Sequence, residues 1–210
     1  MSANRYPKQC YLMLKQIDES GRITWVTHVK DLLFRYGFGI VWITENVGDN
    51  NEFIYVFKQR LIDCALQDWH TEITQSRKAI HYRHFKTLLN VETYLKLDIL
   101  FKFKIAFSRF RCSAHNLLVE TGRHHNIPYD DRICALCNTQ YIEDEYHVFM
   151  KCPFYNNLRH QYLEGIIDLN NVNHNAFYNI VSISNPVKLK AICIFVYEMF
   201  KLRNEFLNTQ

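Results

Sequence analysis

The chain has 210 residues, of which 48% are hydrophobic and 15% aromatic, and its formal net charge at pH 7 is +4. Its 6 Gly and 4 Pro are too few for a loop-rich or all-β fold, which needs such residues in turns. No apolar run is long enough to span a bilayer, and the polar start, MSANRYPKQC, lacks the apolar stretch of a secretory signal.

We therefore expect an intracellular protein of the nucleus or cytoplasm that makes no contact with membranes. In a reducing compartment cysteines rarely form disulfides. The 7 cysteines are accordingly interpreted as free thiols or metal ligands.

The first half of the sequence predicts amphipathic helices. Residues 25–36 have apolar positions at helical spacing, and Gly37 follows as a stop. Residues 49–73 open with a possible capping box, Asp49 to Glu52, and then carry an apolar residue at nearly every fourth position. A further helical stretch is predicted over residues 76–87.

The second half reads as helical on both sides of a cysteine cluster. Residues 97–121 predict one long helix ended by Gly122, although the alternation FKFKIAF could also be a strand. A loop then leads to the cysteines, and Pro153 suits the first turn of a helix that continues to about residue 163. Asn185 and Pro186 predict the cap and first residue of a last helix.

Basic residues are concentrated between Ser76 and Arg111. This segment holds nine Lys or Arg against two acidic residues, a net +7, so the remainder of the chain carries −3. Such a segment is typical of a surface that binds polyanions. A solvated helical face explains the charge equally well, so charge alone does not decide between the two interpretations.

The stretch CALCNTQYIEDEYHVFMKCP carries four soft ligands with the spacing Cys134-x2-Cys137-x9-His147-x4-Cys152. Three Cys and one His form a standard structural zinc set, in which all four coordination positions come from the protein. Asp144 is placed to cap a short helix that carries His147. We expect a structural Zn²⁺, and its closed ligand set favours a scaffold over a hydrolase.

Other interpretations of the cluster have less support. A redox pair at Cys134 and Cys137 needs a βαβ context, which the sequence does not offer. A Cys–His nucleophile pair leaves the third cysteine without a role. Ser113 beside His115 is the best candidate for a nucleophile elsewhere, and no Gly-rich phosphate loop accompanies it. His115 is better explained without a metal, because the four-ligand set is already complete.

The region FRCSAHNLLVETGRHHNIPYDDRICALCNTQYIEDEYHVFMKCPFYNNLR resembles the zinc-binding region that follows the polymerase domain in non-LTR (LINE-type) retrotransposon reverse transcriptases. The shared features are the basic-aromatic helix expected over Phe110–Leu118, Arg132 ahead of the first cysteine, the E-D-E-x-H run leading to His147, and K-C-P followed by a Pro-led helix with Arg159. The resemblance is strong over residues 100–163. The last fifty residues match only loosely.

The resemblance implies a module that grips template RNA or target DNA, with the polymerase portion of the parent protein as a further partner. It supports Cys134, Cys137, His147 and Cys152 as zinc ligands. The chain itself has no polymerase motif, because Tyr129-Asp130-Asp131 lies in a loop and lacks the spacing of the paired polymerase aspartates. It also has no nuclease-type acidic cluster after Cys152. The residues expected to contact the nucleic-acid backbone are Lys102, Lys104, Arg109, Arg111, Arg123, Lys151 and Arg159.

Together these observations predict an all-α fold, an irregular helical domain with a small CCHC zinc knuckle inserted between helices. We expect an N-terminal helical linker region over residues 1–96 and a zinc-knuckle helical domain over residues 97–210. The expected function is a non-catalytic, zinc-stabilised nucleic-acid-binding module. The alternative is a helical protein-interaction module with a structural zinc.

Overall fold

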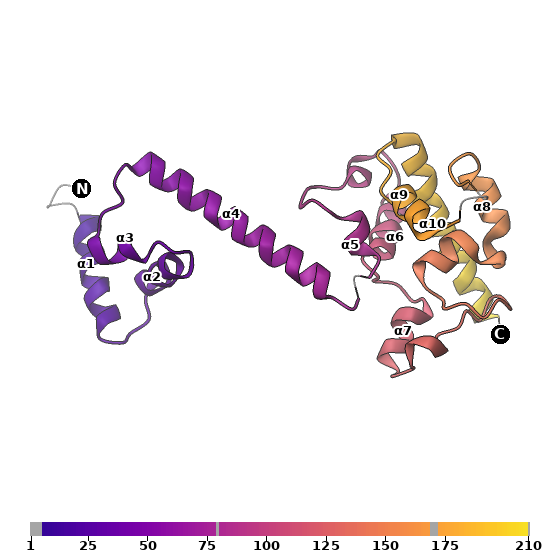
Figure 1. Ribbon diagram of the computed structural model, residues 1–210, viewed down its shortest axis with the longest axis horizontal. Coiled ribbons are helices and arrows are strands. Elements are labelled where there is room, and N and C mark those ends of the chain that lie inside the picture. Colours follow the sequence, from indigo (N-terminus) through magenta and orange to yellow (C-terminus); the bar gives the residue numbers. More distant parts are fainter. Residues whose placement is uncertain (1–5, 79, 169–171, 210) are drawn as a thin grey trace. The chain divides into compact units, whose positions relative to one another are not determined.

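The computed structural model describes residues 6–78, 80–168 and 172–209, and over these the chain is all-α, as predicted. Extended pairing in the described residues is limited to one antiparallel bridge between Ile133 and Ile142. The chain divides into two compact units, Met1–Trp69 and His70–Gln210, here called the N-terminal unit and the C-terminal unit. Figure 1 shows the helices of each unit.

The N-terminal unit contains α1 (Tyr6–Glu19), α2 (Trp25–Arg35), α3 (Gly39–Thr44) and most of α4 (Asn50–Gln75). The predicted helix over 25–36 is confirmed: Thr24 and Thr27 form a reciprocal capping box at its start, and Gly37 follows it with a φ of 85°. Positive φ is a conformation that glycine adopts at little cost. Val26, Leu33 and Trp42 are the buried core of this unit.

Helix α4 confirms the prediction for residues 49–73 and extends it to Gln75. The side chain of Asp49 accepts a hydrogen bond from the backbone N–H of Glu52 at 2.9 Å, which is one half of the expected capping box. Despite its regular apolar pattern, α4 has no buried residue. The pattern therefore predicted the helix correctly, and its apolar face is only partly covered: Phe53 and Phe57 are half-buried against the core of the N-terminal unit.

The C-terminal unit holds the larger core, and α10 (Pro186–Asn208) packs against α6 (Phe101–Arg111) and α8 (Asn156–Leu163). The fully buried side chains at its centre include Phe107, Phe110, Phe149, Phe177 and Phe195. The remaining elements are α5 (Tyr82–Phe85), η1 (Thr93–Lys96), α7 (Leu118–His124), η2 (Tyr129–Asp131), η3 (His147–Lys151), η4 (Pro153–Tyr155) and α9 (His174–Val181).

The division between the units lies within α4, whereas the sequence placed it between residues 96 and 97. Phe85 and Tyr94 belong to the buried core of the C-terminal unit, which explains why residues 70–96 group with it. In the predicted helical stretch 76–87, the described residues form only the short helix α5.

The single helix predicted over residues 97–121 is wrong, because the chain turns between α6 and α7. Ser113, two residues after α6, has a φ of 49°, which a continuing helix cannot accommodate. Gly122 lies inside α7 instead of ending a helix. A Cβ at this position would lie 2.9 Å from the side-chain Cγ of Arg132, so the glycine allows Arg132 to approach the helix.

The last helix begins as predicted. The side chain of Asn185 accepts hydrogen bonds from the backbone N–H groups of Val187 and Lys188, both at 3.1 Å, and Pro186 occupies the first turn. Within the described residues, no single helix has both the length and the apolar character needed to cross a membrane. Helices α9 and α10 reach that length and composition only as a pair, and they are bent by 109° at the break between them.

Candidate metal centre

The first two ligands, Cys134 and Cys137, lie in a tight loop closed by a short antiparallel ladder. The backbone N–H of Cys134 donates to the carbonyl of Tyr141 at 2.9 Å, and the N–H of Glu143 donates to the carbonyl of Arg132 at 2.8 Å. Gln140 has a φ of 57°, which turns the chain back towards the ladder. This knuckle places Cys134 and Cys137 on one edge of the cluster.

The other two ligands, His147 and Cys152, lie at the two ends of the π-helical turn η3. Asp144 accepts a hydrogen bond from the backbone N–H of His147 at 2.7 Å, so the predicted cap is confirmed. The N–H of Cys152 donates to the carbonyl of His147 at 2.7 Å, which is the i→i+5 bond of a π-helix. In an α-helix, residues five apart point in different directions. The wider π turn instead brings His147 and Cys152 to the same side.

The four ligand atoms lie within 4.8 Å of one another. The Sγ atoms of Cys134 and Cys152 are 3.9 Å apart, and the Sγ of Cys137 is 3.3 Å from Nε2 of His147. Metal–sulfur bonds of ~2.3 Å and metal–nitrogen bonds of ~2.0–2.1 Å at tetrahedral angles require S–S and S–N separations of roughly 3.8 and 3.5 Å. The cluster therefore has the dimensions of a tetrahedral metal site, and the sulfurs are too far apart for a disulfide.

The cluster lies mostly inside the protein. Cys134, His147 and Cys152 are buried, and Cys137 is half-buried. The neighbouring thiol of Cys152, together with burial, raises the pKa of Cys134 to about 12 when no metal is present. Nδ1 of His147 is also buried and has no hydrogen-bond partner among the described residues, whereas Nε2 faces Cys137. The four residues could bind a metal ion.

Arg159 holds the ligand-bearing turn from inside the protein. Its guanidinium donates to the backbone carbonyls of Val148 at 3.2 Å and of Cys152, and to the side chain of Asn156 at 2.7 Å. It is only 5% exposed. These bonds satisfy carbonyls that a π turn leaves without helical partners. Arg159 was expected to contact nucleic acid, but it is buried and stabilises the metal-ligand turn instead.

A buried carboxylate links the knuckle to α7 and α10. Glu143 accepts two hydrogen bonds from the guanidinium of Arg203, both at 2.8 Å, and one from the backbone N–H of Leu118 at 2.7 Å. Its carboxylate thus caps α7 from a position 25 residues further along the chain. The pair is almost fully buried, and both charges have hydrogen-bonding partners. The first residue of E-D-E-x-H therefore connects the knuckle to α7 and α10.

Arg111 is also buried, although it was expected to contact nucleic acid. Its guanidinium pairs with Glu92, donates to the carbonyl of Phe85 at 3.3 Å and lies 5.5 Å from the ring centre of Tyr94. With a side-chain exposure of 4% it is inaccessible to a phosphate. Its role is to attach the segment before α6 to the core.

The other expected contact residues lie at the surface of the C-terminal unit. Lys102, Arg109, Arg123 and Lys151 are exposed and Lys104 is half-buried. Arg123 pairs with Glu120 at 2.9 Å, and Lys104 donates to the carbonyl of Leu95 at 2.9 Å. Lys102 and Arg109 both line an open groove between α6 and α10. The groove is also lined by residues that the sequence analysis did not predict as functional, among them Tyr197 and Asn204 of α10.

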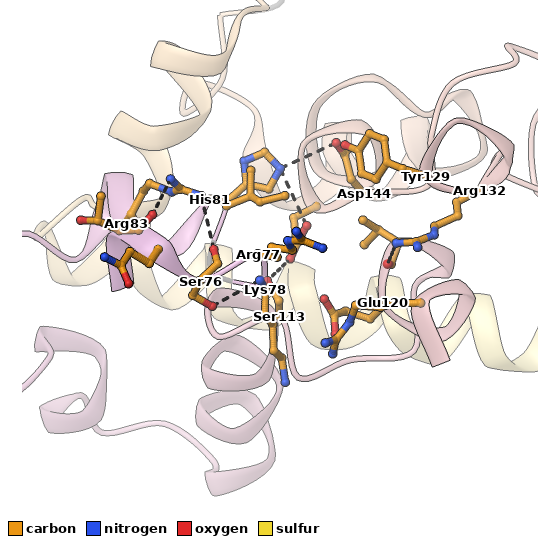
Figure 2. Close-up of a pocket in the computed structure, with 16 residues that line it drawn as sticks. Ser76, Arg77, Lys78, His81, Arg83, Ser113, Glu120, Tyr129, Arg132 and Asp144 are labelled. Atoms are coloured by element: carbon orange, nitrogen blue, oxygen red, sulfur yellow. Dashed lines mark hydrogen bonds and ion pairs between the residues drawn. The ribbon is translucent and has the colours of Figure 1, made fainter. Parts of the chain in front are cut away.

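A separate cavity of about 560 Å³ lies beside the knuckle and is drawn in Figure 2. His81 points to Asp144, with Nε2 3.7 Å from its carboxylate and 3.8 Å from that of Glu145. Burial raises the pKa of Glu145, but the hydrogen bond and charge of His115 and the charge of His81 outweigh it and leave the pKa below its ordinary value. Arg132 donates to the backbone carbonyls of Val119 and Ile127. Five Lys or Arg residues and three acidic residues line this cavity, and the guanidinium of Arg132 is already bonded to backbone carbonyls.

The Ser113–His115 pair does not form a nucleophile. The hydroxyl of Ser113 and Nε2 of His115 both bind the same oxygen of Glu145, so the imidazole is not placed to take a proton from the serine. Asp130 and Asp131 lie exposed in η2, consistent with loop acids. His124 and His125 are exposed, and Cys64 is only half-buried whereas Cys193 is fully buried.

The geometry therefore gives one compact Cys3His cluster, supported by buried charged residues, and a basic groove on the same unit. Comparisons with models of protein families, with curated proteins and with solved structures found no significant match to this chain.

Proposed function

We propose that the chain is a non-catalytic module that binds nucleic acid and whose C-terminal unit is stabilised by a structural Zn²⁺. The observation that carries the proposal is the convergence of Cys134, Cys137, His147 and Cys152 at the spacing of a tetrahedral site. Three thiolates and an imidazole suit zinc better than magnesium or calcium, which prefer oxygen ligands. Because the protein supplies all four ligands, the site has no open position for a catalytic water.

The surface of the same unit supports nucleic acid as the partner. Lys102 and Arg109 share a groove, and Arg123 and Lys151 are exposed elsewhere on the unit. Lysine and arginine bind phosphates through charge and direct hydrogen bonds, and such binding weakens steeply as salt rises. The burial of Arg111 and Arg159 reduces the number of expected contacts without removing those in the groove.

We further propose that the chain corresponds to the C-terminal region of a non-LTR retrotransposon reverse transcriptase. The support is the motif resemblance together with the roles of its residues in this chain. Within E-D-E-x-H, Glu143 binds Arg203, Asp144 caps the ligand turn, and Glu145 binds His115. The ligand of the module would then be template RNA or target DNA, and the polymerase portion of the parent protein a further partner.

A protein-interaction module with a structural zinc is the second candidate. It is favoured by α4, on which Phe53 and Phe57 are half-buried against the core of the N-terminal unit while neighbouring apolar side chains are exposed. Ile54 and Tyr55 are 62% and 71% exposed. An exposed amphipathic helix is a common docking element for another protein. In this case binding of RNA or DNA would be absent and salt would have little effect on function.

The first test is metal content. Native mass spectrometry of the purified chain should find one Zn²⁺ bound, and Cys137→Ser should lose it together with part of the helical signal in circular dichroism. Cys10→Ser is the matched control, because Cys10 is exposed and lies outside the cluster. A folded chain without metal would contradict the zinc assignment.

The second test is binding of RNA and DNA oligonucleotides by the zinc-loaded chain at two salt concentrations. We expect the affinity to fall by at least tenfold between about 50 and about 200 mM salt, since several phosphate contacts are released together. No binding to any oligonucleotide at the lower salt concentration would favour the protein-interaction candidate.

A further inference from the structure

The groove between α6 and α10 combines cations, aromatic rings and amides in one open depression. Its volume is about 710 Å³, which is in the range of sites that enclose a small organic group. Lys102 and Arg109 lie on its α6 side and Lys201 on its α10 side. One carboxylate, Glu205, also lines it. Three cations against one anion give the groove a positive charge.

The rings of Tyr197 and Phe200 form the apolar part of the groove. Tyr197 is half-buried, and one of its neighbours is Phe103 of α6, whose ring lies edge-on at 5.2 Å. The ammonium group of Lys102 lies 4.5 Å from the ring centre of Tyr197. An exposed cation over a ring is held weakly, so a flat aromatic group can replace it while the lysine turns to a phosphate.

Two asparagines form a pair at the same groove. The side-chain amide of Asn116 donates to the side-chain oxygen of Asn204 at 2.8 Å. This leaves an acceptor on Asn116 and a donor on Asn204 without a further partner among the described residues. An adjacent donor and acceptor match the hydrogen-bonding edge of a nucleobase.

We infer that this groove, formed by Lys102, Arg109, Asn116, Tyr197 and Asn204, binds an unpaired nucleotide of a single-stranded nucleic acid. The phosphates contact Lys102 and Arg109, the base lies against Tyr197, and the paired asparagines contact its edge. The inference rests on the proposed function and specifies which strand type that function requires. Basic grooves with aromatic platforms bind single strands because every unpaired base offers a face for stacking.

The same features argue against a duplex or a protein at this position. In a duplex the bases are stacked on each other, so none is free to lie against Tyr197. A protein partner would be expected to bring a carboxylate to Lys102 and Arg109, but it would not need the Asn116–Asn204 edge. Arg109 is exposed, and no ion pair to it is found among the described residues, so it is available for a phosphate.

The test measures binding of the zinc-loaded full chain to a 12-nucleotide single strand that carries one 2-aminopurine, made as RNA and as DNA, and to the matching duplex. The variants are Arg109→Ala, Asn204→Ala, Tyr197→Ala and Tyr197→Phe. Lys190→Ala is the matched control, because Lys190 is an exposed cation of α10 that does not line the groove. Circular dichroism of each variant shows whether it folds.

We expect the single strand to bind more tightly than the duplex, with the 2-aminopurine fluorescence quenched on binding. Tyr197→Ala should weaken binding by roughly 5- to 100-fold, whereas Tyr197→Phe keeps the ring and should bind as the wild type does. Arg109→Ala should reduce the slope of log affinity against log salt by about 0.7, the value for one phosphate of a single strand. Lys190→Ala should change neither quantity.

Two different results would overturn the inference and can be told apart. If the wild-type chain binds nucleic acid but Arg109→Ala, Asn204→Ala and folded Tyr197→Ala bind equally well, the groove is wrong and the proposed function stands. A tighter affinity for the duplex has the same meaning. If the zinc-loaded wild type binds neither strand nor duplex, the proposed function fails and the groove inference fails with it. Preference for the RNA or the DNA strand identifies which of the two is the ligand.

Discussion

The N-terminal and C-terminal units differ in how completely each one buries its own apolar residues. In the C-terminal unit one hydrophobic core includes buried residues from Phe85 to Met199, and the buried pair of Glu143 and Arg203 and the Cys3His cluster lie within this unit. In the N-terminal unit the buried core consists of Val26, Leu33 and Trp42, and α4 adds the partly buried Phe53 and Phe57. The contrast is that the C-terminal unit has a large buried core and a cluster that could bind a metal, whereas apolar side chains of the N-terminal unit are more exposed.

The comparison can be tested separately in each unit because all 3 tryptophans, Trp25, Trp42 and Trp69, belong to the N-terminal unit. Tryptophan fluorescence therefore reports mainly on the N-terminal unit through Trp25 and Trp42, while Trp69 lies at the division between the units. Helical content, and tyrosine signals corrected for the tryptophan contribution, report mainly on the larger C-terminal unit.

The largest expected effect is that of metal removal. Chelation, or Cys152→Ser, should destabilise the C-terminal unit. Its apparent free energy of unfolding should fall by several kcal/mol, and by up to on the order of 10 kcal/mol, because metal binding is coupled to folding. Thermal unfolding followed by circular dichroism measures this loss. The tryptophan transition should stay in place. A shift of both transitions together would show that the units are not independent.

The next effect comes from the buried pair of Glu143 and Arg203. Arg203→Met should destabilise the C-terminal unit by about 3–5 kcal/mol, since it leaves a buried carboxylate without its charge partner. Urea unfolding of the zinc-loaded chain measures it. Lys201→Met on the same helix is the control, and its exposed ion pairs at 3.9 Å should contribute less than about 1 kcal/mol. Equal effects of the two variants would contradict a special role for the buried pair.

A core substitution in the N-terminal unit gives the converse test. Val26→Ala should lower the stability of that unit by about 2 kcal/mol through lost burial and a small cavity, and should leave the metal-dependent transition unchanged. The readout is the urea midpoint of tryptophan fluorescence. Val56→Ala on the exposed side of α4 should have almost no effect. If Val56→Ala matched Val26→Ala, α4 would be packed in solution, and the comparison between the units would lose its basis.

Alkaline pH should weaken the C-terminal core through Cys193. Burial raises the pKa of this thiol to about 12 from an ordinary value near 9, so the unfolded chain releases the proton first as pH rises. The contribution of the neutral Cys193 thiol to folding stability is therefore fully present below pH 9 and is lost as pH rises towards 12. At pH 10.5 the loss from this group should be roughly 1–2 kcal/mol. Urea unfolding at pH 8 and 10.5 should show a shallower dependence in Cys193→Ala than in the wild type; equal dependences would remove Cys193 as the cause.

The smallest effect concerns the knuckle loop. Gln140 is exposed and has a φ of 57°, a conformation that glycine adopts without strain. Gln140→Gly should raise the stability of the zinc-loaded unit by up to about 1 kcal/mol. Asn138→Gly, in the same loop without a positive φ, should lower it slightly. Differential scanning calorimetry of both variants distinguishes the sign, and a loss in Gln140→Gly would show that the wild-type turn is unstrained.

The sequence was most informative where structure depends on neighbouring residues. The caps at Asp49 and Asn185, the stop at Gly37 and the spacing of the four ligands are all local patterns, and each is found in the structure. The family and the nucleic-acid function remain predictions, because neither the geometry nor the comparisons test them.

Long-range contacts explain the features that the sequence analysis missed. The helix predicted over residues 97–121 ends at Arg111, and the new start at Leu118 is capped by Glu143, which lies 25 residues away in the chain. The polar run after Arg111 was the available sign of a turn. Arg111 and Arg159 look like the exposed cations beside them, and only their tertiary contacts show that they are buried.

The π turn at η3 also has a consequence for how the ligand spacing can change during evolution. A π turn differs from an α-helical turn by one additional residue. A chain that lost one residue between His147 and Cys152 would return to an ordinary helix and still present both ligands on one side. A chain that gained one would turn them apart. We therefore expect homologous clusters to tolerate a His-x3-Cys spacing and to exclude His-x5-Cys, a rule that sequence comparison alone can check.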